Sequence, residues 1–185
     1  MADLLIIVGA ATPPGRLAAA MQAAAEIAGG AETLNLADAG VEICDGRADD
    51  AYNEATRGAV AKMMAARSVL IAAPVYRASY PGVLKNLLDI APVAVLQSKP
   101  VGIVAMGGSP HHYLAVDTQL RAVLAWFGAL VAPTGVYLTG GDFKDGKLAA
   151  EGALKDMAAL VDTLARLRGL DPASLGPIPL AARYT

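Results

Sequence analysis

The sequence predicts an α/β fold in which a five-stranded parallel sheet lies between two layers of helices, a three-layer sandwich. Short, continuously apolar runs alternate along the chain with longer segments rich in alanine and leucine. The apolar runs lack the polar alternation of a half-exposed strand, which is typical of strands buried on both faces of a parallel sheet. Right-handed crossovers between such strands place helices on both faces of the sheet.

Residue types at the segment ends justify each element. The first helix is alanine-rich and stops at the glycine pair 29–30, and Asn53 is suited to cap the second helix. Pro81 fits the first turn of the third helix, and Pro92 should bend or end that helix. Pro133 indicates that the last strand begins at an edge of the sheet. We therefore expect strands over 4–8, 33–36, 69–75, 101–106 and 131–138, and helices over 16–28, 53–67, 81–96, 112–130 and 148–167.

The chain of 185 residues is long enough for one domain with its own core. Five strand–helix units most commonly adopt the flavodoxin-like strand order 2-1-3-4-5. We assign residues 1–170 to this domain. Residues 171–185 form a proline-rich tail without periodicity, which is either a disordered end or an arm laid on a neighbouring subunit.

Composition excludes several classes of protein. The 15 lysines and arginines against 17 aspartates and glutamates give a net charge of −2, which argues against a nucleic-acid partner. The single Cys44 excludes an intrachain disulfide and a cysteine-based zinc site. No apolar run is long enough to span a membrane and no signal peptide is recognisable, so we expect a cytoplasmic protein. Hydrophobic residues make up 55% of the chain, which predicts a sizeable interface between subunits.

The ligand site is expected at one edge of the sheet. Ligands of open parallel sheets bind beyond the carboxyl ends of the strands, at the point where the strand order reverses. Three predicted loops converge there, over residues 9–16, 74–82 and 107–113. These loops also carry glycines, prolines and hydroxyl groups, which is an independent indication of a binding edge.

The first loop, 9–16, enters a helix whose free N–H groups and positive dipole end suit a phosphate. Thr12 adds a hydroxyl and Arg16 a charged donor, with Gly15 at the start of the helix. The alternative interpretation is an ordinary strand-to-helix turn with a solvated arginine. The loop matches neither the phosphate-binding loop of ATPases nor the glycine fingerprint of dinucleotide-binding proteins, so those sites are unsupported.

The second and third loops suit a planar ligand. Tyr76, Arg77 and Tyr80 offer an aromatic wall and backbone donors to a ring system, although the tyrosines could instead cap the edge of the core. The glycine pair 107–108 lets a flat ring approach the backbone. The histidine pair 111–112 is not expected to bind a metal, because adjacent side chains point in different directions and no acidic residue lies nearby.

Other reactive residues have simpler interpretations. Cys44 lies in the polar loop 37–52 without a cysteine or histidine beside it, so we interpret it as an incidental thiol. Asp89 and Asp117 lie in predicted helices and are expected to form caps or ion pairs. The G-x-S-x-G motif of serine hydrolases is absent from the sequence, so that chemistry has no support.

The run 74–89 (PVYRASYPGVLKNLLD) resembles the signature of the NADPH-dependent FMN reductases, a family of flavodoxin-like fold. The closest resemblance is to the reductase component of two-component alkanesulfonate monooxygenases. The glycine pair 107–108 and the segment 114–124 (LAVDTQLRAVL) agree with that reductase in order and spacing. The resemblance covers residues 4–165, and its middle motif is the specific part.

The resemblance implies an oxidoreductase that passes a hydride from NADPH or NADH to FMN, with the chemistry carried by the cofactor and no side chain needed as acid or base. Loop 9–16 would hold the FMN phosphate, residues 74–77 would present N–H groups to the isoalloxazine edge, and residues 107–109 would hold its other side. The implied cofactor-binding residues are Thr12, Gly15, Arg16, Pro74, Val75, Tyr76, Arg77, Gly107, Gly108 and Ser109. Reduced FMN would then leave for a flavin-dependent monooxygenase.

The resemblance also implies a homodimer or homotetramer built through the helices that follow the third and fourth strands. Apolar residues on those helices fit this use. They are Val83, Leu84, Leu87, Leu88, Ile90, Leu120, Val123, Leu124, Trp126 and Phe127.

The chain departs from the family in its phosphate loop, where Ala10, Thr12 and Gly15 stand in place of a serine, an arginine and a second serine. Each lost hydrogen bond to a charged group is worth roughly 1.5–3 kcal/mol, so weaker FMN binding is expected. The helix around Thr118 also lacks the inserted tyrosine of the alkanesulfonate reductase. Two alternatives stay open: a flavin-retaining reductase of quinones, chromate or azo compounds, and a non-catalytic flavodoxin-like module that has lost its flavin.

Overall fold

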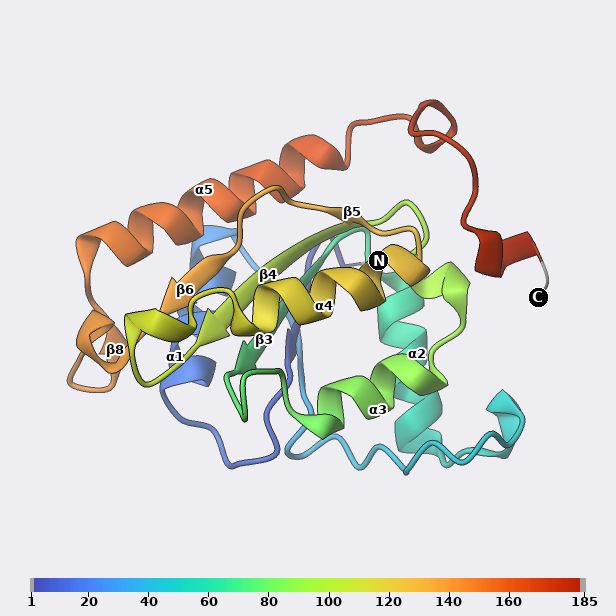
Figure 1. The fold of residues 1–185 in the computed structure, drawn as a ribbon, viewed down its shortest axis with the longest axis horizontal. Helices are drawn as coiled ribbons and strands as arrows, with labels where there is room; N and C mark the ends of the chain where they lie inside the picture. Colours follow the sequence, from blue (N-terminus) through green and yellow to red (C-terminus); the bar gives the residue numbers. More distant parts are fainter. Residues whose placement is uncertain (1, 184–185) are drawn as a thin grey trace.

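A computed structural model describes residues 2–183 as a parallel sheet between two layers of helices (Figure 1). The strand order is β2-β1-β3-β4, and both β5 and β6 pair with β4 at the far edge. This confirms the predicted fold class and strand order. The strands are β1 (Leu5–Val8), β2 (Glu32–Asn35), β3 (Val69–Pro74), β4 (Pro100–Met106), β5 (Leu130–Val131) and β6 (Val136–Leu138).

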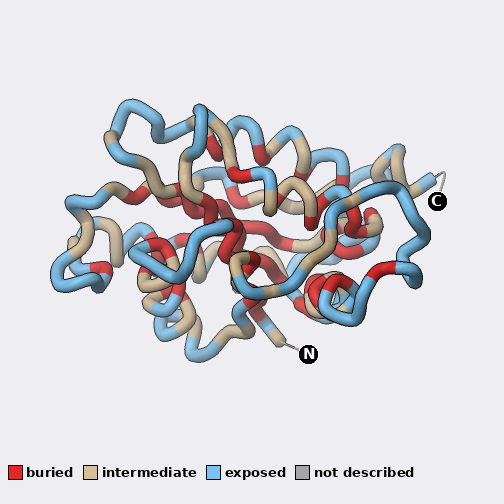
Figure 2. Tube along the Cα trace, turned by 90° about the horizontal axis from the view of Figure 1, so that it is seen from below, coloured by how far each residue is buried: buried red, intermediate tan, exposed pale blue. Residues whose placement is uncertain are grey.

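Side chains of the strands alternate between two cores, because the sheet is buried on both faces. In β1, Leu5 and Ile7 face α2, α3 and α4, whereas Ile6 and Val8 face α1 and α5. Figure 2 shows the buried residues concentrated along the centre of the molecule between more exposed helices. The helices are α1 (Arg16–Ile27), α2 (Glu54–Ala65), α3 (Gly82–Ile90), α4 (Ala115–Trp126) and α5 (Glu151–Leu167).

Asn53 and Pro92 mark helix ends as predicted, but the predicted helix 81–96 is too long, because α3 spans Gly82–Ile90. The Asn53 side chain accepts a hydrogen bond from the Thr56 amide at 2.7 Å, which caps α2 as predicted. Helix α3 ends at Ile90, just before Pro92, because a residue that precedes proline avoids the helical conformation. Asp89 pairs with Lys85 within α3, and Asp117 pairs with Arg121 within α4, so both carboxylates form the expected ion pairs.

The predicted strand 131–138 is wrong as a single element, because it is interrupted between β5 and β6. Pro133 has no N–H group for the ladder, so pairing with β4 stops there. The Arg121 guanidinium donates to the carbonyls of Ala132 and Pro133 at 3.0 and 3.2 Å, and its pairing with Asp117 fixes it in place. A side chain from α4 therefore satisfies the backbone where the strand is broken.

A hairpin precedes the last helix, which begins at Glu151 and not at the predicted residue 148. Strands β7 (Phe143–Lys144) and β8 (Lys147–Leu148) pair antiparallel across a turn in which Asp145 and Gly146 both have positive φ. An Asp-Gly pair is well suited to such a two-residue turn. Helix α4 also begins later than predicted, because residues 110–112 form a separate 3₁₀ turn.

The described part of the tail, up to residue 183, packs on its own chain, although the sequence suggested a disordered end or an arm on a neighbour. Its last 3₁₀ turn, Leu180–Arg183, contacts the turn Val93–Val95. Pro179 lies against Gly128, where a Cβ atom would come within 2.4 Å of the proline ring. Gly128 also has a φ of +65°, so both the contact and the backbone require glycine there.

Most of the apolar residues proposed for subunit contacts are buried within the chain itself. Leu84, Leu87, Leu120 and Leu124 belong to the core between α3, α4 and the sheet, because they lie on the inner faces of those helices. That part of the expectation is wrong. Trp126, at the end of α4, is 65% exposed and stays available for a partner. Within residues 2–183, no helix has the length and apolarity needed to cross a lipid bilayer.

Candidate functional site

A cavity of about 360 Å³ lies at the carboxyl edge of the sheet, where the sequence placed the ligand site. Its floor consists of the last residues of four strands, which are Val8, Asn35, Pro74 and Met106. Its wall is the loop after β1 and the first turn of α1, and it includes Thr12, Pro13, Pro14, Gly15, Arg16 and Leu17. The structure therefore brings together four of the predicted site residues, namely Thr12, Gly15, Arg16 and Pro74.

The first turn of α1 presents unused donors at this cavity. Gly15 precedes the helix without a side-chain cap, and within residues 2–183 the amides of Arg16, Leu17 and Ala18 have no acceptor. The Arg16 side chain forms no ion pair or hydrogen bond with the described residues. Its guanidinium lies beside Gly140, 3.2 Å from where a Cβ atom of that glycine would stand. Free amides and a free guanidinium suit an anion such as phosphate.

The loop after β3 forms a tight turn whose two central residues, Arg77 and Ala78, have φ values of 51° and 61°. Hydrogen bonds between Tyr76 and Ser79 close the turn in both directions, at 2.7 and 3.0 Å. Left-handed backbone at residues other than glycine costs of order 1–3 kcal/mol each and is concentrated at functional sites. The turn leaves two amides free, since those of Arg77 and Ala78 have no acceptor within the described residues.

This geometry modifies the expectation that residues 74–77 all offer N–H groups. Pro74 has none, and the Val75 amide donates to the Met106 carbonyl at 2.8 Å. The Tyr76 amide is used within the turn. Arg77 is therefore the one predicted residue of this loop that keeps a free N–H. Tyr76 is 44% exposed, so its ring is accessible to a ligand.

The loop after β4 is held in place by Tyr137, a residue of β6 that sequence reasoning missed. The Tyr137 hydroxyl donates to the Ser109 carbonyl at 2.7 Å. A Cβ atom at Gly107 would lie 2.0 Å from that hydroxyl, so only glycine allows this contact. Burial raises the pKa of Tyr137 above its ordinary value. The amides of Gly108 and Ser109 have no acceptor in the described part of the chain.

Two further lining residues, Asn35 and Met106, were also missed by sequence reasoning. Both are the last residues of their strands, and both face α1 together with Val8. The only local signal was their position, because a strand's final residue in a parallel sheet borders the carboxyl edge. Their residue types carried no functional indication.

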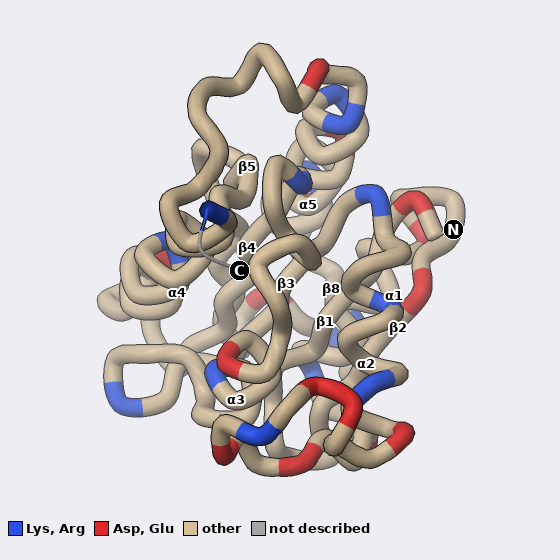
Figure 3. The backbone as a smooth tube through the Cα atoms, turned by 90° about the vertical axis from the view of Figure 1, so that its right-hand side faces the viewer, with Lys and Arg blue, Asp and Glu red and all other residues tan. Residues whose placement is uncertain are grey.

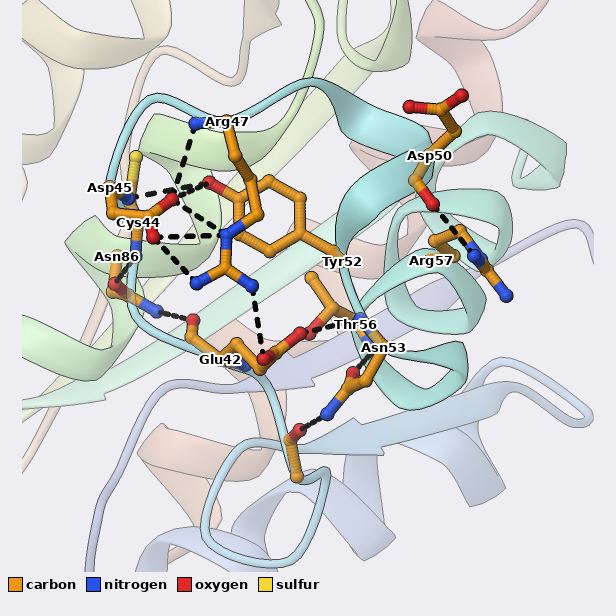
Figure 4. Close-up of polar contacts among 11 residues, drawn as sticks. Glu42, Cys44, Asp45, Arg47, Asp50, Tyr52, Asn53, Thr56, Arg57 and Asn86 are labelled. Carbon is orange, nitrogen blue, oxygen red and sulfur yellow. Dashed lines mark hydrogen bonds and ion pairs between the residues drawn. The ribbon is translucent and has the colours of Figure 1, made fainter.

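The loop after β2 holds a separate polar cluster (Figure 4). The Arg47 guanidinium pairs with Asp45 and Glu42 and lies 4.9 Å above the centre of the Tyr52 ring. Its hydrogen bonds hold the pKa of Asp45 down at about 2. Asn86 of α3 accepts from the Cys44 amide at 2.8 Å and donates to the Glu42 carbonyl at 2.7 Å. These contacts anchor the loop on α3, which is a structural role.

The strand order and the cavity at its switch point define a flavodoxin-like α/β protein with its candidate ligand site at the carboxyl edge of the sheet. The chain belongs to the NADPH-dependent FMN reductase family, whose model matches residues 2–144. The fold and the family both agree with the resemblance seen in the sequence.

Similar proteins support this assignment. The chain is 40% identical over 106 residues to an NAD(P)H-dependent FAD/FMN reductase of Geobacillus thermodenitrificans, which is 57% of each chain. It is 46% identical over 83 residues to an NADH-dependent FMN reductase of Pseudomonas fluorescens, covering 45% of this chain and 44% of that one. These alignments thus span about half the length of the curated relatives. The NAD(P)H:acceptor oxidoreductase FerB of Paracoccus denitrificans shares the fold, with a TM-score of 0.76 and 18% identity over 91% of this chain and 97% of that chain.

Proposed function

We propose that this protein is an NAD(P)H-dependent FMN reductase. The observation that carries the proposal is the set of unused donors at the carboxyl edge of the sheet. Among residues 2–183, three loops at this edge contribute amides without an acceptor, and Arg16, which lines the cavity, contributes an unpaired guanidinium. Family membership indicates which ligand these donors serve.

The residues present fit FMN. The free amides of α1 and the Arg16 guanidinium suit its phosphate, with the Thr12 hydroxyl beside them. The strained turn offers the free amides of Arg77 and Ala78 to a ring edge, and Tyr76 offers an exposed aromatic face. Gly107, Gly108 and Ser109 leave the opposite side of the edge open to a planar group, with the loop fixed by Tyr137.

When bound, FMN supplies a ring that accepts a hydride from the nicotinamide, which is why the protein needs no acid or base of its own. The residues of this chain would bind the flavin and orient its ring. Arg16 and the helix amides would fix the phosphate end, and the loops after β3 and β4 would set the plane in which a ring can lie. The Tyr137–Ser109 hydrogen bond keeps the third loop in that arrangement.

We further propose that FMN is a substrate that leaves after reduction and serves a partner monooxygenase. The phosphate loop supports this, because Ala10 and Gly15 provide no hydroxyl and the side-chain donors reduce to Thr12 and Arg16. Each missing hydrogen bond to a charged phosphate weakens binding by roughly 1.5–3 kcal/mol. Weak binding suits a flavin that must dissociate.

The test is a fluorescence titration with FMN, followed by oxidation of NADPH and NADH by the same sample in excess FMN. The proposal expects a colourless purified protein, reversible FMN binding and turnover with at least one nicotinamide. A yellow protein that retains its flavin through gel filtration would contradict release. Absence of turnover with both nicotinamides would overturn the reductase assignment.

A further inference from the structure

The lysines of the hairpin 143–148 form an unusual pair. Lys144 and Lys147 lie directly opposite each other across the two antiparallel strands. Side chains at such positions leave the same face of the hairpin, with Cβ atoms about 5 Å apart, and like charges there are destabilising. The next pair, Phe143 and Leu148, packs toward the core beside α1. The two lysines therefore stay exposed on the outer face.

Neither lysine has a partner of opposite charge among the residues that the structure describes. Within residues 2–183, no carboxylate lies within ion-pair distance of Lys144 or Lys147, although Asp145 lies between them in the turn. By contrast, two cations at the opposite edge of the sheet are paired with carboxylates. Lys62, in the last turn of α2, binds Glu32, and Arg166, in the last turn of α5, binds Asp162. Two like charges held together without a counterion suit an external dianion.

The hairpin lies beside the candidate site. Strand β8 packs against α1, and the buried Leu148 shares a core with Leu17, which lines the cavity. The turn before the hairpin contains Gly140, against which the Arg16 guanidinium rests. In Figure 1, β8 lies next to the start of α1, at the edge where the β4 and β6 arrows end. The lysine pair thus lies on the outer side of the hairpin, next to the end of the candidate site that Arg16 and the start of α1 form.

The turn chemistry fixes this hairpin. Asp145 and Gly146 adopt the left-handed conformation that a two-residue hairpin turn needs, and Thr139 and Asp142 cap each other just before the hairpin. The Thr139 amide donates to the Asp142 carboxylate at 2.7 Å, so this nearby carboxylate already has a hydrogen-bond partner. The family match ends at residue 144, so β8 and Lys147 lie outside the region that defines the family.

We propose that Lys144 and Lys147 bind the 2′-phosphate of NADPH and so make this chain prefer NADPH over NADH. The inference rests on the proposed reductase function. A phosphate monoester carries close to two negative charges at neutral pH, which matches two ammonium groups facing one way. A pyrophosphate has only one charge on each phosphorus, and the FMN phosphate already has donors at Arg16 and the start of α1.

The first experiment measures binding without turnover. Adenosine 2′,5′-bisphosphate and 5′-AMP are titrated calorimetrically into the wild type and into the Lys144→Gln/Lys147→Gln double variant. We expect the wild type to prefer the bisphosphate by at least about tenfold, as a lost charged hydrogen bond would predict, and the variant to lose that preference. The control Lys62→Gln/Arg166→Gln removes the same amount of charge from the opposite edge of the sheet. This control should keep the preference for the bisphosphate.

Kinetics separate the two sources of a phosphate monoester. In the hairpin variant, the KM for NADPH should rise about tenfold or more, while the KM for NADH and the Kd for FMN stay unchanged. A fall in FMN affinity instead would assign the lysines to the flavin phosphate and overturn the proposal. Equal effects on both nicotinamides, or none, would also overturn it.

The two hypotheses fail separately. A wild type that prefers adenosine 2′,5′-bisphosphate but oxidises neither nicotinamide would contradict the reductase and support the phosphate site. A wild type that reduces FMN but shows no preference for the bisphosphate would support the reductase and contradict the phosphate site. The exposed hairpin positions should tolerate glutamine, because removal of one like-charge pair relieves repulsion, and circular dichroism of the variant checks that it folds.

Discussion

The conformation of the loop after β4 depends on the absence of a side chain at Gly107. A methyl group there would lie 2.0 Å from the Tyr137 hydroxyl, and that hydroxyl holds Ser109. The neighbouring Gly108 has open space instead, with nothing within 4 Å of its added Cβ. Neither glycine has a positive φ, so steric contact alone distinguishes them.

Gly107→Ala should therefore destabilise the fold by about 1–3 kcal/mol, as overpacking does. Tyr137→Phe should cost about 1 kcal/mol through its lost hydrogen bond, and the double variant should lose less than the sum because phenylalanine makes room. Urea unfolding measures all three, with Gly108→Ala as the near-neutral control. Additive losses in the double variant would refute the proposed contact.

Arg16 is the residue on which the proposed phosphate site depends most, since it is the one charged side chain of that loop. Arg16→Ala should weaken FMN binding about 10- to 100-fold. Riboflavin lacks the phosphate, so its affinity should not change. Fluorescence titration of both flavins measures this, with Arg57→Ala on α2 as the control. Equal losses for both flavins would mean that Arg16 contacts the ring and not the phosphate.

At the scale of elements, the long loop after β2 is held chiefly by polar contacts, with one short 3₁₀ turn at Asp49–Ala51. Arg47 joins Glu42 to Asp45, and Asn53 caps α2 at the loop's other end. In Figure 3 this segment runs below the labels α2 and α3, where acidic and basic residues are interspersed. Residues 37–52 are thus held mainly by polar contacts, and only Tyr52 among them is buried.

This arrangement predicts a pH dependence. The pKa of Asp45 falls from its ordinary value of 3.8 to about 2, chiefly because the Arg47 side chain donates hydrogen bonds to the carboxylate. A lowered carboxyl pKa stabilises the fold above about pH 4, and that contribution is lost as the pH falls through about 2. Carboxyl NMR titration measures the pKa directly. Arg47→Gln should return it toward 3.8, and an ordinary pKa in the wild type would contradict the pairing.

At the scale of the whole molecule, the exposed apolar residues indicate where a second subunit could attach. The inner faces of α3 and α4 are already used by the core, so a subunit contact through these helices would use their outer faces. Trp126 is the largest exposed apolar side chain on those two helices, and Ile43, at 74% exposed, lies elsewhere on the loop after β2.

We predict that the full chain is a homodimer or homotetramer in solution and that Trp126→Glu shifts it toward a smaller species. A buried charge without a partner is costly, so an interface that covers residue 126 cannot accept glutamate without loss. Sedimentation velocity at micromolar concentration measures the mass. Ile43→Glu is the matched control and should leave the mass unchanged. A wild type that sediments as a monomer would contradict the prediction.

The sequence by itself determined the class of the fold. Continuously apolar runs such as 4–8 can be buried only between two layers, and glycine, proline and asparagine mark the element ends through local backbone preferences. The segment 74–89 likewise indicated the family. Its motif is one uninterrupted stretch of chain, so it can be recognised without knowing which distant segments meet.

Only the tertiary structure decided how distant residues meet. Tyr137 reaches Ser109 because β6 pairs with β4, and Asn35 reaches the cavity because β2 pairs with β1. The split of the last strand into β5 and β6 and the return of Pro179 to Gly128 also depend on contacts between distant segments. Local patterns specify which segments become strands and helices, whereas the contacts that shape a site depend on strand register and on packing between segments far apart in the chain.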